Sequence, residues 1–139
     1  MQLITDRTKN DVLLKTEKGY YSYSDLNRVE SAVADLAVIA QGLGVTKQFE
    51  TKTDWGVPGL FSAAAWPTKQ QMQRYLNNVH ELCGAVEAAA DLPSSMDRLT
   101  FNGANQIEEA LSLAFERMDK IIRSLRYSGE IFAEKESYL

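Results

Sequence analysis

The candidate metal ligands and catalytic groups in this chain are acidic side chains, one histidine and one cysteine. A di-iron centre in a helical bundle needs a glutamate from each of two helices and two Glu-x-x-His pairs. The single histidine is His80, and the position where its paired glutamate would stand is occupied by Asn77. A zinc site fails for the same lack of histidine and cysteine ligands. The sequence therefore predicts no metal ion and no cofactor.

His80 and Cys83 remain as candidates for catalysis, because residues three apart meet on one side of a helix. Cys83 belongs to an apolar helix face, where a thiol is usually an inert core residue. Glu81 follows His80 directly and therefore points elsewhere on a helix. The glycine-rich phosphate loop and the Gly-x-Ser-x-Gly motif of hydrolases are absent from the sequence. We predict that the chain has no catalytic residues and is not an enzyme.

Composition narrows the class of protein further. The chain has 139 residues, 45% of them hydrophobic and 24% charged, which is typical of one globular domain. Its net charge of -4 argues against a general nucleic-acid binder. The basic residues near the N-terminus alternate with acidic ones, which indicates a solvated face (Arg7, Lys9, Lys15 and Lys18). We find neither a secretion signal nor an uncharged apolar run long enough for a bilayer, so we predict no membrane insertion.

A long helix over residues 101–126 is the element around which the rest must be arranged. Its apolar residues follow a heptad repeat with alternating gaps of 3 and 4: Ala104, Ile107, Leu111, Ala114, Met118, Ile121 and Leu125. The opposite side carries charged residues that we expect in solvent: Glu108, Glu109, Glu116, Asp119, Lys120 and Arg123. Such a helix is stable only if other elements cover its apolar side.

Two further helices supply that cover. Residues 25–42 carry a second heptad repeat, with Ser22 or Ser24 as the N-cap and glycines at the end. Residues 68–90 form a third helix that begins at Thr68 and ends before Pro93. A short helix over 6–18, capped by Thr5 or Asp6 and ended by Gly19, precedes them. The segment 45–66 has no helical period, and the tail 130–139 is expected to be loosely held.

These elements predict a single all-α domain over residues 1–139. We expect an antiparallel, up-down-up bundle of three long helices, with a short N-terminal helix and one long irregular connection at 45–66. Irregular connections of that length are uncommon in compact domains and are often functional. Apolar residues in and beside this connection are candidates for an association surface: Trp55, Phe61 and Trp66.

Short stretches in a fixed order resemble a family of small proteins and domains encoded by phages and prophages of Firmicutes, beside tail and baseplate genes. The matching stretches are 4–8 (ITDRT), 11–12 (DV), 19–30 (GYYSYSDLNRVE), 51–55 (TKTDW), 66–68 (WPT), 72 (M), 74–76 (RYL), 78–79 (NV), 92–97 (LPSSMD), 103–108 (GANQIE) and 126–130 (RYSGE). The resemblance spans nearly the whole chain. It carries no catalytic signature, so no site residues transfer with it.

The resemblance implies a virion structural protein of the tail or baseplate, made in the cytoplasm of the host bacterium. Its expected partners are other copies of itself, as a cyclic homo-oligomer, and other phage tail proteins. An alternative is a non-catalytic binding or adaptor module that uses segment 45–66 to recognise a host or partner ligand. An enzyme or a regulator is a third alternative.

Overall fold

The computed structural model describes residues 2–56 and 67–136, and the side chains of that part as far as Leu125. The elements in chain order are α1 (Lys9–Leu13), the 3₁₀ helix η1 (Glu17–Gly19), α2 (Tyr23–Gly42), α3 (Lys69–Ala85) and α4 (Phe101–Glu136). Within the described ranges the structure has helices and no strand. The prediction of an all-α bundle of three long helices with a short N-terminal helix is confirmed.

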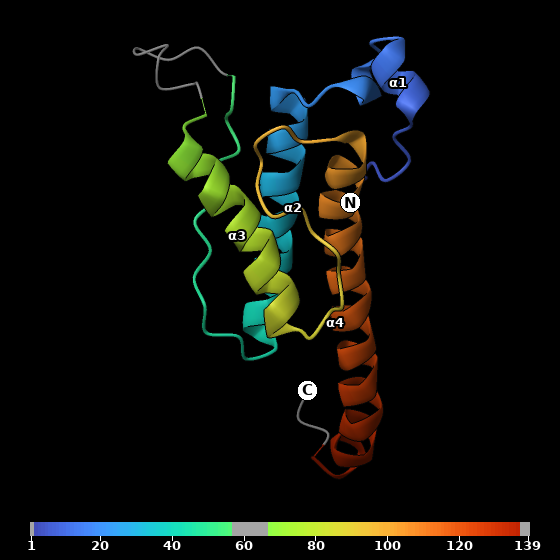
Figure 1. Ribbon diagram of the computed structural model, residues 1–139. Coiled ribbons are helices and arrows are strands. Elements are labelled where there is room, and N and C mark those ends of the chain that lie inside the picture. Colours follow the sequence, from blue (N-terminus) through green and yellow to red (C-terminus); the bar gives the residue numbers. More distant parts are fainter. Residues whose placement is uncertain (1, 57–66, 137–139) are drawn as a thin grey trace.

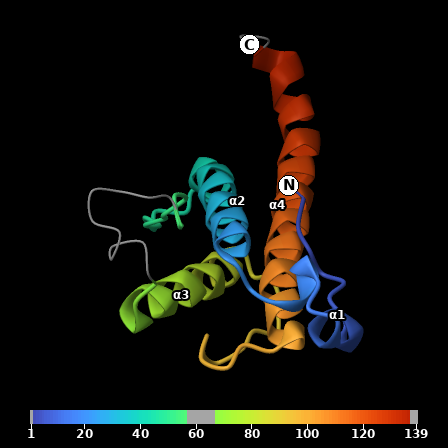
Figure 2. The ribbon, with the colours of Figure 1, turned by 90° about the horizontal axis from the view of Figure 1, so that it is seen from above.

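The three long helices all begin at the same end of the molecule, with α3 crossing the other two, which corrects the expected antiparallel, up-down-up order. In Figure 1, α2, α3 and α4 all begin at the upper end of the molecule, and Figure 2 shows α2 and α4 running in the same direction with α3 lying across them. Two hydrogen bonds agree with this direction: Cys83 contacts Ala110, and the later residue Val86 contacts the later residue Arg117. The chain therefore returns twice to its starting end, through the connections 43–68 and 86–100.

Helix α2 follows the sequence prediction closely. Ser22 is its N-cap, in a capping box with Asp25. The helix ends at a left-handed Gly44, and the Val45 N–H donates to the Ala40 carbonyl at 3.0 Å. The heptad residues of α2 are buried against α3 and α4: Leu26, Val29, Val33, Leu36 and Ala40.

Helix α3 begins at its predicted cap, Thr68, whose hydroxyl accepts from the Gln71 N–H at 3.1 Å. It ends at Ala85, however, five residues before the predicted end. Glu87 adopts a left-handed conformation, with φ of 57°, and the Ala88 N–H donates to the Cys83 carbonyl at 2.9 Å. This hydrogen-bond pattern usually has glycine at the left-handed position. Because residue 87 is glutamate, this end of the helix could not be predicted.

Helix α4 is longer than predicted and continues past Gly129 to Glu136. A single glycine inside a helix costs only about 1 kcal/mol, and no proline follows it to stop the helix. Beyond Met118 the helix extends past the ends of α2 and α3, as Figures 1 and 2 both show. Residues 119–136 span about 27 Å at 1.5 Å per residue.

The N-terminal helix is shorter than predicted. It begins at a Thr8–Asp11 capping box rather than at Thr5 or Asp6, and a left-handed Lys15 ends it before Gly19. Gly19 serves a different purpose, because a Cβ there would lie 2.0 Å from the Asp11 carbonyl oxygen. The residue is required by this close backbone approach and not by a positive φ.

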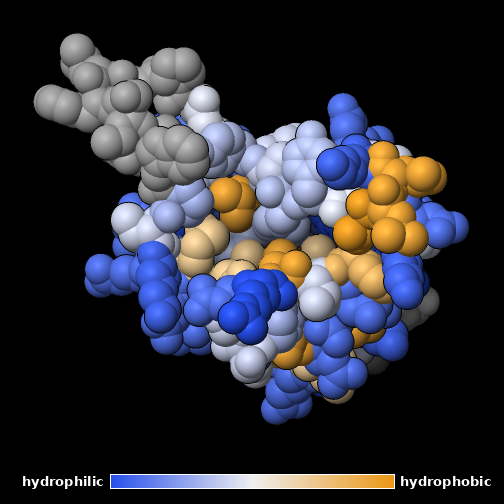
Figure 3. Space-filling view, turned by 45° about the horizontal axis from the view of Figure 1, so that its top comes forward, coloured by the Kyte–Doolittle hydropathy of each residue, from blue (hydrophilic) through white to orange (hydrophobic). Residues whose placement is uncertain are grey.

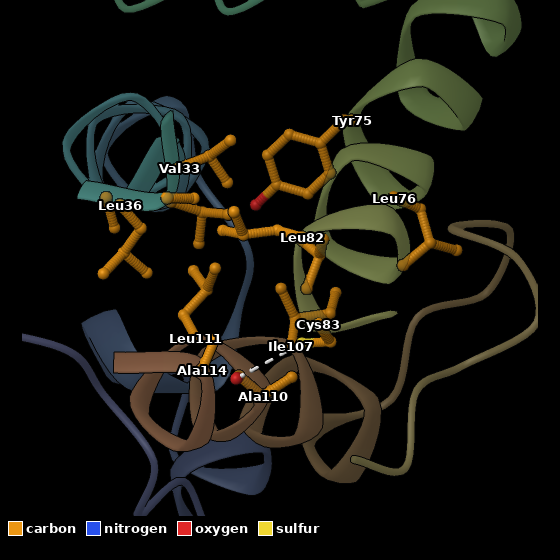
Figure 4. Packing of buried hydrophobic residues seen from close by; sticks show 14 of the residues in the cluster. Val33, Leu36, Tyr75, Leu76, Leu82, Cys83, Ile107, Ala110, Leu111 and Ala114 are labelled. Carbon is orange, nitrogen blue, oxygen red and sulfur yellow. Dashed lines mark hydrogen bonds between the residues drawn. The ribbon is translucent and has the colours of Figure 1, made fainter. Parts of the chain in front are cut away.

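One hydrophobic core lies between α2, α3 and α4. Figure 4 shows Val33 and Leu36 from α2 meeting Tyr75 and Leu82 from α3, above Leu111 and its neighbours on α4. The apolar heptad residues of α4 from Ile107 to Met118 have no exposed surface. The core therefore covers the first half of the α4 heptad repeat.

Candidate functional site

The predicted association residue Trp55 lies in the core, with 2% of its surface exposed. Its indole Nε1 donates to Glu30 Oε2 at 2.6 Å, and its backbone N–H and carbonyl bond to the Asn27 side chain at 2.8 and 3.0 Å. The expectation that the Trp55 side chain forms an exposed association surface is therefore wrong. The other two candidates, Phe61 and Trp66, lie outside the described residues.

The segment before Trp55 is fastened to the bundle by the same group of polar contacts. The Arg74 guanidinium donates to both Glu30 oxygens, at 2.7 and 2.9 Å, and to the Glu50 carbonyl at 2.7 Å. These hydrogen bonds to Glu30 raise the pKa of Arg74. The Asn78 amide donates to the same Glu50 carbonyl at 2.7 Å. Residues 50–55 are thus held against α2 and α3 by hydrogen bonds from half-buried and buried polar side chains.

A second buried group of charges joins the N-terminal segment to the bundle. Glu108 has no exposed surface and accepts from Arg7 Nη2 at 2.6 Å, Arg28 Nε at 2.6 Å and the Ile4 N–H at 3.0 Å. Asp25 accepts from both arginines. We call these four side chains the Arg7–Glu108 cluster: Arg7, Asp25, Arg28 and Glu108. The expectation that Arg7 and Glu108 face solvent is wrong, because each charge has opposite charges within hydrogen-bonding distance.

The charges of the cluster balance one another. Although burial by itself raises the pKa of Asp25, the Ser22 N–H and the Arg28 guanidinium outweigh that effect and hold the pKa below its ordinary value of 3.8. Hydrogen bonds to Glu108 and Asp25 raise the pKa of Arg28. Two positive and two negative side chains compensate one another, so this cluster stabilises the fold rather than offering a charge to a ligand.

The His80–Cys83 pair is not assembled as a reactive site. Cys83 is buried, its thiol donates to the Ala110 carbonyl at 3.4 Å, and burial raises its pKa to about 11. His80 is exposed. A protonated thiol in the core is a poor nucleophile, which agrees with the interpretation of Cys83 as a core residue.

A groove of about 570 Å³ lies between α3 and the connection before α4. Its apolar part includes Leu26, Met72 and Met96, and its polar rim includes His80 and Asp97. The rim lacks a buried charge aimed into the space, so it gives no particular ligand chemistry.

The projecting half of α4 leaves its apolar side uncovered. Helical spacing places Ile121, Ile122 and Leu125 on the same side as the buried Leu111 and Met118. Ile122 is exposed, and 58% of Leu125 is exposed. We call the exposed residues on this side the α4 face: Phe115, Ile122 and Leu125.

A second apolar surface lies at α1, in the N-terminal segment that contacts the first turns of α4. None of the residues of α1 is buried, and 67% of Leu13 and 74% of Leu14 are exposed. Together with the neighbouring Val12 they form what we call the α1 patch. Figure 3 shows an apolar patch on the side where α1 lies in Figure 1. Sequence reasoning missed this surface because three consecutive apolar residues in a short helix do not show by their spacing whether they are buried.

Neither a metal centre nor a membrane span appears among the described residues. No group of three or more histidine, cysteine, aspartate or glutamate side chains is placed to hold a metal ion there. None of the helices in that part of the chain is long and apolar enough to cross a membrane.

Comparisons with known proteins leave the resemblance to phage proteins as a prediction. No protein-family model, curated protein or solved structure matches the chain.

Proposed function

We propose that this protein is a structural component of a phage tail or baseplate, without catalytic activity, that assembles through helix packing. The single observation that carries the proposal is the projecting half of α4. Its apolar side continues the buried heptad repeat past the bundle, where α2 and α3 no longer cover it.

An isolated amphipathic helix of this length gains little from its own hydrogen bonds, and most helical stability in proteins comes from packing of the apolar side. Exposed apolar surfaces rimmed by charged residues commonly mark sites of protein association. Glu116, Asp119 and Arg123 supply such a rim along α4. The projecting helix therefore fits a protein whose final state is an assembly.

The choice of a phage tail or baseplate rests on the sequence resemblance. Other copies of the chain and other tail proteins are the proposed partners, with synthesis in the host cytoplasm and final location in the virion. The buried charges support a structural role because they are all paired within the fold.

Deletion of the gene from the encoding phage or prophage tests the proposal. Negative-stain electron microscopy of the induced lysate should show missing or malformed tails, and a plasmid copy of the wild-type gene should restore them. Normal tails and full infectivity without the gene would contradict the proposal.

A binding module is the alternative, and the groove beside α3 is the observation that favours it. The same deletion separates the two functions. Particles with normal tails that no longer adsorb to the host would indicate ligand recognition rather than assembly. A Met72→Glu variant, which changes the apolar part of the groove, should then reproduce that adsorption defect without affecting tail formation.

A further inference from the structure

Most exposed apolar side chains in the described residues lie in two separate regions of the molecule. Eight large hydrophobic side chains are exposed among the described residues. Four lie at the N-terminal end and include the α1 patch, three form the α4 face, and the eighth is Val38 on α2. This separation into two groups is more than the scattered single exposures that surfaces normally show.

The positions of the two surfaces follow from the contacts of α4. The N-terminal segment is fixed beside the first turns of α4, because Ile4 and Arg7 donate backbone N–H groups to Glu108 and Asn105 at 3.0 Å. From Glu108 to Ile122 the helix advances about 21 Å. The α1 patch therefore lies near the start of α4, and Ile122 and Leu125 of the α4 face lie just past the middle of that helix.

We propose that the α4 face of one copy packs against the α1 patch of the next copy, in a head-to-tail contact. A second copy is the natural occupant because one chain carries both surfaces but cannot bring its own together. A two-fold contact through either surface would leave the other exposed on both copies. A single head-to-tail contact, repeated, covers both surfaces on every copy.

The contact extends a packing arrangement that the chain already uses. Within one copy, the α4 heptad repeat is covered by α2 and α3 as far as Met118. In the assembly, the neighbouring α1 covers the same side of α4 beyond that point. Lys9 and Lys15 with Asp11 and Glu17 border the α1 patch, and charges of both signs also border the α4 face. Neither surface presents a uniform charge that would repel the other.

A head-to-tail contact produces a closed ring or an open filament, depending on the rotation between copies. Closure gives each copy two contacts, so individually weak contacts hold a ring together. The inference rests on the proposed function and deepens it by naming the two surfaces through which copies of the chain meet.

Two double variants of the full-length chain test the contact. Leu13→Asp with Leu14→Asp removes the α1 patch, and Ile122→Asp with Leu125→Asp removes the α4 face. Val38→Asp is the matched control, because Val38 is 69% exposed but belongs to neither surface. Circular dichroism first establishes that each variant keeps the wild-type helical signal. Analytical ultracentrifugation then measures mass from low to high micromolar concentration.

The wild type and Val38→Asp should assemble, and each double variant should be monomeric. An equimolar mixture of the two double variants should form a dimer and stop there, because one intact α1 patch can still meet one intact α4 face. Assembly of either double variant by itself would overturn the head-to-tail contact. So would a mixture that stays monomeric at the highest concentration measured, because a single intact contact should form there without closure of a ring.

A wild-type chain that is monomeric at every concentration would overturn self-association altogether. The proposed tail function would still be tested separately, by the gene deletion. The two failures are therefore distinguishable.

Discussion

Glu108 is the residue on which the junction between the N-terminal segment and α4 depends. It accepts hydrogen bonds from Ile4, Arg7 and Arg28 and has no exposed surface. Its removal would leave two guanidinium groups near the core with one carboxylate between them. The main cost of removing Glu108 is therefore that buried partners are left without a hydrogen bond. The net gain from any one of its hydrogen bonds is smaller.

Replacing Glu108 by Ala should lower the free energy of unfolding by about 3–5 kcal/mol, the usual cost of removing one partner from a buried ion pair. Glu109→Ala is the matched control, because Glu109 is the exposed neighbour on the same helix. It should change stability by less than about 0.5 kcal/mol. Urea denaturation measures both values. Equal effects of the two substitutions would mean that Glu108 is not held as described.

Asp25 makes the free energy of unfolding depend on pH in the acidic range. Because the pKa of Asp25 is lowered in the folded state, the unfolded chain binds this proton more readily. The stabilisation from Asp25 is complete above its ordinary pKa of 3.8 and is lost as the pH falls from there through the lowered value. Urea denaturation at a series of acidic pH values should therefore show a smaller loss of stability in Asp25→Asn than in the wild type.

The control for this measurement is Asp35→Asn, since Asp35 is exposed on the same helix. It should retain the acid dependence of the wild type. An Asp25→Asn variant with an unchanged slope would show that the carboxylate of Asp25 is not stabilised by folding.

Heptad spacing predicted the buried apolar residues of α2 and α4, but the buried charges depend on partners that are distant in sequence. Arg7 and Glu108 are separated by most of the chain, so neither reveals the other's position. One signal was present: Glu108 occupies the same heptad position as Phe115 and Ile122. A charged residue at a position that is otherwise apolar marks a place where a buried partner is needed.

At the scale of elements, the two halves of α4 differ in what covers them. Leu111 is fully buried between α2 and α3, whereas Leu125 on the same side of the helix is largely exposed. Leu111→Ala should cost about 2–5 kcal/mol of stability, as for other buried leucines. In the monomer, Leu125→Ala should cost less than about 0.5 kcal/mol.

Denaturation at low protein concentration, where association is minimal, is the measurement for both leucines. A loss below about 0.5 kcal/mol for Leu111→Ala would remove it from the core. A large loss for Leu125→Ala would mean that the projecting half of α4 is covered within the monomer.

The ends of the helices were predictable where ordinary caps occur and not elsewhere. Ser22, Thr68 and the glycines after α2 placed three ends correctly. The ends of α1 and α3 use Lys15 and Glu87 in left-handed conformations, which these residues rarely adopt. No local pattern distinguishes such positions, because tertiary contacts decide them.

At the scale of the molecule, the lengths of the two connections bear on the direction of the helices. Short loops favour antiparallel neighbours, but 43–68 and 86–100 are long. At about 3.3 Å per extended residue, the shorter connection reaches about 50 Å, while the 17 residues of α3 span about 26 Å. Both connections are therefore long enough to return the chain to its starting end, so their lengths permit three helices that begin at the same end.

The association surface was predictable only in part. The apolar residues of 121–125 belong to the heptad repeat that the sequence predicts, but only the structure separates the covered half from the uncovered one. Trp55 was misplaced because a large aromatic residue in an irregular segment can equally fill a core. Here its indole N–H has a buried partner in Glu30.

The central claim, that this chain is built into a phage tail, is tested most directly by quantitative mass spectrometry of purified particles from the encoding phage. We predict that the chain is present in a fixed ratio to the other tail proteins and remains after a high-salt wash. Abundant chain in the lysate together with its absence from the particles would contradict the claim.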